Sequence, residues 1–101
     1  MSYPITKAER AVTLQLISTL KGVNRTDGRL IGKIEDDLRL GEVVAVAQAD
    51  VDVTDTFDLG ELEVAWILDH VNKAFEKSEM PPMMAKYALS LEAKLKDPKP
   101  D

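Results

Sequence analysis

The chain contains no cysteine and only one histidine among its 101 residues. Without cysteine it can form no disulfide framework, no thiolate zinc site and no cysteine nucleophile. Aromatic residues make up only 5%, and the longest apolar runs, 43–47 and 64–68, have five residues each. A membrane-spanning helix needs about 20 apolar residues, so we expect no membrane partner. The N-terminus has no apolar stretch behind a basic start, which favours a cytoplasmic protein.

The length and the composition favour a single, mainly α-helical domain. The chain is 45% hydrophobic, which is enough to form one modest core and argues against wholesale disorder. We expect a compact bundle of four or five helices in residues 1–96, with a flexible tail at 97–101. No internal repeat or cofactor motif is recognisable, so no cofactor is predicted.

The first and last helices are clearly marked. Thr6 and Glu9 form the Ser/Thr-x-x-Glu pattern of a capping box, and an apolar stripe follows until a stop near Gly22. The last helix is expected at 82–96, because Pro82 can open a helix but cannot continue one.

The middle of the chain is harder to assign. A second helix is expected at roughly 29–40, with Thr26 or Asp27 as its cap. Residues 43–56 are ambiguous: the apolar run favours a short helix at 42–49, whereas strict alternation favours a strand over 47–54. An isolated strand needs a partner, and the same strand of a second subunit is the one expected.

A central helix is predicted over 59–77. Asp58 and Glu61 have the spacing of a capping box, and Phe57 is expected to staple onto Leu62. Methionines flank the prolines that follow, at 80, 83 and 84. Their helical spacing favours core packing, with a docking surface as the alternative.

The charge is divided into blocks. Residues 1–34 carry six basic and two acidic side chains, whereas residues 35–63 carry ten acidic residues and a single arginine. Such blocks attract each other within the fold, pair between subunits, or bind a basic partner. Duplex DNA is not expected, because its affinity comes from neutralising phosphates with Lys and Arg.

The leading functional hypothesis is a small protein-interaction or regulatory module of the accessory or inhibitor type, and not an enzyme. It would act through apolar helix faces and an acidic surface, as a homodimer or higher oligomer, on a basic protein surface, or both. His70, the only histidine, has no nucleophile at a recognisable spacing, so no catalytic residue is predicted. The predicted partner-binding residues are Glu35, Asp36, Asp37, Glu42, Asp50, Asp52, Asp55 and Asp58. In size and composition, the chain is similar to small accessory or inhibitor proteins of phages and mobile elements.

One alternative is a site for a nucleotide, RNA or another phosphate ligand in the basic segment 21–33. Its candidate residues recur every four positions: Lys21, Arg25, Arg29 and Lys33. A basic loop beside a helix N-terminus suits a phosphate group, although solvated lysines and arginines facing the acidic block account for the same pattern.

A second alternative is a calcium site, because residues 50–61 resemble a degenerate EF-hand loop. Oxygen-bearing side chains occupy the ligand positions: Asp50, Asp52, Thr54, Asp58 and Glu61. The resemblance implies that these oxygens converge on one hard cation. The chain departs from the pattern at Asp55, which stands where the family has its turn glycine. Strand alternation and helix capping explain the same residues without a metal.

Overall fold

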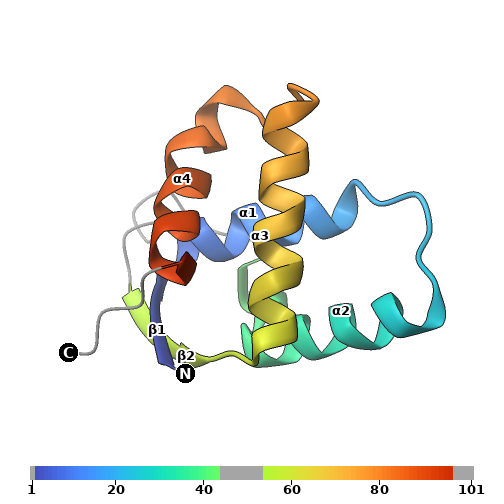
Figure 1. Ribbon diagram of the computed structural model, residues 1–101. Helices are drawn as coiled ribbons and strands as arrows, with labels where there is room; N and C mark the ends of the chain where they lie inside the picture. Colours follow the sequence, from blue (N-terminus) through green and yellow to red (C-terminus); the bar gives the residue numbers. More distant parts are fainter. Residues whose placement is uncertain (1, 44–53, 97–101) are drawn as a thin grey trace.

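Four α-helices and a two-stranded sheet make up the part of the chain that the computed structural model describes, residues 2–43 and 54–96 (Figure 1). In chain order the elements are β1 (Ser2–Thr6), α1 (Lys7–Ser18), α2 (Arg25–Asp37), a 3₁₀ turn η1 (Leu40–Val43), β2 (Thr54–Asp58), α3 (Glu61–Glu76) and α4 (Pro82–Lys96). The prediction of a mainly helical bundle is confirmed. The predicted tail at 97–101 lies outside the described residues.

The helices pack around α3, as Figure 1 shows: α3 and α4 run antiparallel side by side, and α1 passes behind both. One hydrophobic cluster joins these three helices with α2 and the sheet. Its fully buried members include Ile34, Ile67, Val71 and Leu91, each 0% exposed. Burial of one such side chain contributes about 1.5–3 kcal/mol, so this cluster is the main source of stability.

The start of α1 confirms the predicted capping box. The Thr6 hydroxyl accepts a hydrogen bond from the Glu9 amide (3.1 Å), and the Thr6 amide donates to Glu9 Oε1 (2.8 Å). Glu9 is only 1% exposed, and its Oε1 also accepts from Lys94 Nζ at 2.8 Å. The cap therefore attaches the start of α1 to the end of α4.

The predicted bounds of the second helix were wrong by several residues at both ends. The N-cap of α2 is Asn24, whose side chain accepts from the Asp27 amide at 2.8 Å, so neither Thr26 nor Asp27 is the cap. The helix begins with the next residue. It ends before Arg39, which adopts a left-handed conformation with φ 51°, a break that hydrophobic periodicity does not reveal.

The structure contains a two-stranded sheet within the chain, which was not predicted. β2 pairs antiparallel with β1 of the same chain, with Ser2 opposite Asp58 and Thr6 opposite Thr54. β1 was not predicted as a strand, although it buries Tyr3 in the alternating pattern of one. The segment whose alternation suggested a strand is 47–54, and its residues 47–53 lie outside the described residues, so pairing between subunits stays a prediction.

The entry to α3 also differs from the prediction. Asp58 belongs to β2, and the N-cap is Gly60, whose amide donates to Glu63 Oε1 at 3.2 Å. Phe57 is buried on β2, whereas Leu62 is 75% exposed, so the expected staple between them does not form. The strand holds Asp58 in extended backbone, which moves the helix start two residues on.

Candidate functional site

The predicted acidic surface lies on α2, η1 and β2, and α2 and β2 follow the lower edge of the molecule in Figure 1. Glu35 and Asp36 are exposed near the end of α2, and Asp37 beside them is half-buried. The other described members, Glu42, Asp55 and Asp58, are exposed on η1 and β2. Asp50 and Asp52 lie outside the described residues. That these carboxylates bind a partner stays a prediction.

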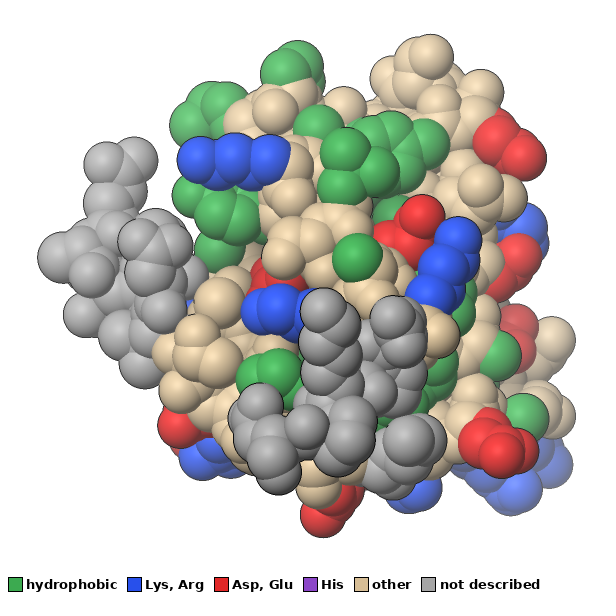
Figure 2. Space-filling view, turned by 60° about the vertical axis from the view of Figure 1, so that its left-hand side comes forward, with side chains coloured by type: hydrophobic (Ala, Val, Ile, Leu, Met, Phe, Trp, Pro, Cys, Tyr) green, Lys and Arg blue, Asp and Glu red, His purple; other side chains and the backbone are tan. Residues whose placement is uncertain are grey.

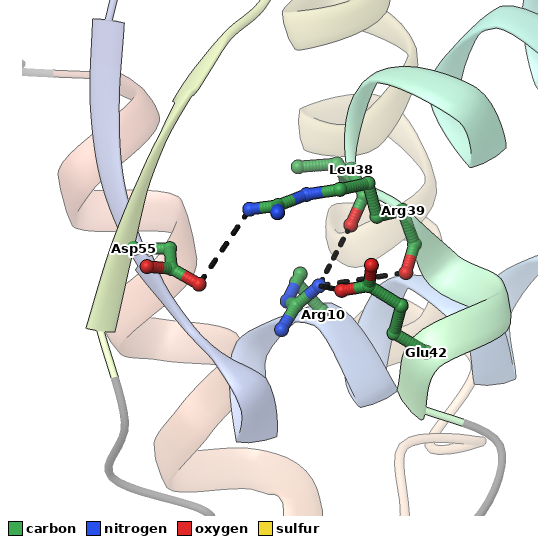
Figure 3. A network of polar contacts seen from close by, with 5 residues as sticks. All are labelled: Arg10, Leu38, Arg39, Glu42 and Asp55. Carbon is green, nitrogen blue, oxygen red and sulfur yellow. Dashed lines mark hydrogen bonds and ion pairs between the residues drawn. The ribbon is translucent and has the colours of Figure 1, made fainter.

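Two carboxylates of this surface already pair with arginines of the same chain (Figure 3). Glu42 Oε2 lies 3.5 Å from Arg10 Nη1, and Asp55 Oδ2 lies 3.5 Å from Arg39 Nη2. Both acids are more than half exposed, but only the Arg39–Asp55 pair is exposed on both sides, and such surface pairs contribute at most about 1 kcal/mol. A partner cation could therefore displace Arg39 from Asp55 at little cost.

Arg10 is only 2% exposed and supports this surface from inside the fold. Its Nη1 donates to the carbonyl of Leu38 (3.0 Å) and lies 3.4 Å from that of Arg39, at the end of α2 (Figure 3). Its guanidinium also lies over the Phe57 ring, 4.9 Å from the centroid. One buried arginine thus holds together the end of α2, η1 and β2. It thereby positions Glu42 on η1 and the strand β2 that carries Asp55.

Carboxylates crowd together where α2 meets α3. Glu63 is 1% exposed, and its Oε1 accepts from Lys33 Nζ at 3.0 Å, while its Oε2 has no partner among the described residues. Burial is the largest cause that raises the pKa of Asp37. The hydrogen bond and the charge of Glu63 raise this pKa further, and the charge of Asp58 adds to the same effect. The hydrogen bond with Glu63 raises the pKa of Lys33. Lys33 pairs with two of these three carboxylates, Glu63 and Asp37, so the negative potential is only partly neutralised.

The four basic residues of segment 21–33 are divided between α2 and the loop before it. Arg25, Arg29 and Lys33 are exposed along α2, but Lys33 is committed to Glu63 and also lies 3.9 Å from Asp37. Lys21 precedes the helix and lines a cleft beside α3. Phosphate binding by these four residues stays a prediction.

The candidate calcium ligands are spread over several elements. Thr54 and Asp58 stand at opposite ends of β2, where four steps of about 3.3 Å separate them by roughly 13 Å. Glu61 is the first residue of α3. Within the described parts of the chain, no group of three or more His, Cys, Asp or Glu side chains is arranged to hold a metal ion. The calcium hypothesis, which also needs the undescribed Asp50 and Asp52, gains no support here.

The single histidine is held by its own helix. His70 stacks on Trp66, with ring centroids 3.8 Å apart, and its Nδ1 lies 2.9 Å from the Trp66 carbonyl oxygen. Because a carbonyl only accepts, Nδ1 carries the proton. Asp69 pairs with Lys73 at 2.9 Å, and this hydrogen bond lowers the pKa of Asp69.

The methionines divide between core and surface. Met80 and Met84 pack against the hydrophobic cluster, as their spacing predicted. Met83 is 80% exposed and Leu89 55% exposed on α4. Figure 2 shows hydrophobic side chains gathered toward the upper end of this face of the molecule.

Comparison of the chain with protein-family models, curated proteins and solved structures finds no match in any of the three. Among the described helices, none is both long and apolar enough to cross a membrane.

Proposed function

We propose that this chain is a small protein-interaction module that binds a basic protein surface through the acidic residues at the end of α2 and the start of α3. The observation that supports the proposal most directly is the carboxylate crowding around Asp37, Glu63 and Asp58, where Lys33 is the one cation that pairs with Glu63 and Asp37 among the described residues. A lysine or arginine from a partner would relieve that repulsion, and complementary charge of this kind gives an interface its specificity and a fast association rate.

Two exposed features beside this cluster suit an interface. Glu35 and Asp36 have no ion pair with any described residue, so their charges are available to a partner. Leu62, on the first turn of α3, exposes 75% of its surface. An apolar anchor surrounded by charged residues is the usual arrangement of a protein-binding surface.

Charge reversal tests the proposal. The double variant Glu35→Lys/Asp36→Lys is compared with Glu76→Lys/Glu79→Lys, which changes the net charge equally at the far end of α3. Binding to an immobilised Arg- and Lys-rich peptide is measured at low and at physiological salt. We expect the first variant to bind about tenfold more weakly, since reversing two exposed charges costs roughly 1–2 kcal/mol. The control should lose much less, and equal losses in both variants would refute a localised binding surface.

Light scattering on the same variants identifies the partner class. Exposed Arg25 and Arg29 at the other end of α2 provide a basic surface on the same chain, so a second copy is one possible partner. A salt-sensitive oligomer that Glu35→Lys/Asp36→Lys dissociates would make the interaction one between like subunits. A monomer of 11.2 kDa in all conditions would leave an unlike basic protein as the partner.

A further inference from the structure

A cleft of about 450 Å³ opens between the C-terminal ends of α1 and α3, away from the acidic surface. This volume is within the range of small-ligand sites, which is about 300–1,000 Å³. Its apolar wall is formed by Leu16 and Leu20 of the α1 end and by Ala74 of α3. The cleft is therefore large enough for a small organic molecule, and it has a surface on which an apolar group can pack.

Three lysines from two separate segments line the same cleft. Lys73 and Lys77 come from the end of α3, and Lys21 comes from the loop that follows α1. Against them the cleft lining contains one carboxylate, Glu79. Lys73 also pairs with Asp69, whereas Lys21 and Lys77 have no ion pair with any described residue. The lining thus carries an excess of positive charge.

Lysines at a helix C-terminus also have an ordinary role, because they offset the negative end of the helix dipole. That role accounts for Lys73 and Lys77, which lie at the end of α3. Lys21 lies two residues beyond Thr19, the C-cap of α1, so the same role applies to it, but that role does not explain why lysines from two helix ends line one cleft. His70 adds a fourth nitrogen-bearing group: its Nδ1 is bound to the Trp66 carbonyl, which leaves Nε2 as the ring nitrogen that can meet a ligand.

A smaller recess of about 30 Å³ adjoins the cleft and shares Leu16 and Ala74 with it. The other apolar residues of its lining are Val12, Met80 and Pro81, and the polar ones are Gln15, Thr19 and Glu79. The apolar surface therefore extends from the cleft toward the start of α4. A ligand with an apolar body would bury that body on this side and keep its charged group near the lysines.

We propose that this cleft binds a small organic phosphate, whose phosphate group lies among Lys21, Lys73 and Lys77 and whose apolar body packs on Leu16 and Leu20. A phosphate monoester suits three cations better than a carboxylate does, because it carries a charge of about −1.5 to −2 at pH 7 and three acceptor oxygens. This site is independent of the acidic binding surface proposed above.

Titration with phenyl phosphate, followed by amide NMR shifts and by the fluorescence of Trp66, tests this site. We expect saturable shifts confined to residues 16–21 and 70–81. Lys77→Gln and Lys21→Gln should each weaken binding by about tenfold, as expected for loss of one charge-assisted contact. Lys86→Gln, which removes the same charge from α4 outside the cleft, should leave the dissociation constant unchanged. Lys21 and Lys77 have no ion pair with any described residue, so these two variants are expected to fold normally.

Four results would overturn the proposal. Absence of saturable shifts would show that the cleft binds no small phosphate. Equal weakening by Lys86→Gln would show that the binding is only a response to net charge. Inorganic phosphate that binds as tightly as phenyl phosphate would show that the apolar wall contributes nothing. A single-stranded oligonucleotide that shifts the same amides when phenyl phosphate does not would assign the lysines to nucleic acid instead.

Discussion

Replacing Arg10 with methionine is expected to lower the free energy of unfolding by about 2–4 kcal/mol. Loss of the 3.0 Å hydrogen bond leaves the buried Leu38 carbonyl without its partner, which costs about 1–3 kcal/mol. Loss of the cation–π contact with Phe57 adds about 1 kcal/mol. Arg10 Nε has no described partner, so relief of its desolvation offsets part of the loss. Methionine fills much of the same volume, which keeps the cavity contribution small.

Guanidinium chloride denaturation, followed by far-UV circular dichroism, measures this effect. Glu42→Gln is the matched control, because it removes only the exposed carboxylate charge and keeps both carbonyl contacts of the guanidinium, so it should cost less than Arg10→Met. Arg10→Lys keeps the charge but not the planar fork that reaches the end of α2, so its stability should lie between those of the wild type and Arg10→Met. An Arg10→Met protein as stable as Glu42→Gln would refute the structural role assigned to the guanidinium.

Two further predictions concern the ends of α2. Asn24→Ala should lower the free energy of unfolding by about 1 kcal/mol through loss of the cap. Thr26→Ala, one position inside the helix, should cost clearly less in the same denaturation assay. The reverse order of the two costs would restore the cap predicted from sequence. The raised pKa of Asp37 means that the folded state binds its proton more tightly than the unfolded state, so this group's contribution should fall as pH rises from its ordinary value of 3.8 through the raised one. Asp37→Asn should remove that decline when stability is compared at pH 4 and pH 7, and an unchanged decline would contradict the assignment.

Sequence reasoning succeeded where the signal is local. The Thr6–Glu9 capping box and the proline at the start of α4 act within one or two turns, and both were predicted from neighbouring residues. Prediction failed where a segment distant in the sequence determines the local structure. β1 is a strand because β2 pairs with it, and α2 stops where the side chain of Arg10, from another helix, reaches its last carbonyls. No periodicity within residues 29–40 contains that information.

The candidate sites show the same division. Exposure of Glu35 and Asp36 follows from their positions on an amphipathic helix, and the sequence predicted it. The cleft was missed, because Lys77 and Lys21 are far apart in the sequence and meet only through the packing of α3 on α1. The regular spacing of lysines and arginines over 21–33 predicted instead one site within a single segment. In the structure Lys21 lines the cleft, whereas the other three residues lie on α2.

Two buried glutamates show how local capping and long-range packing combine. Glu9 and Glu63 each lie three residues beyond a helix N-cap, each is 1% exposed, and each uses Oε1 to accept from the N-cap amide. The same oxygen accepts from a lysine of another helix, Lys94 in α4 or Lys33 in α2. Packing buries each carboxylate, and because a buried carboxylate without a cation costs several kcal/mol, the lysine of the neighbouring helix offsets the cost that packing imposes. Each capping glutamate therefore joins the start of one helix to a lysine of another, α1 to α4 and α3 to α2.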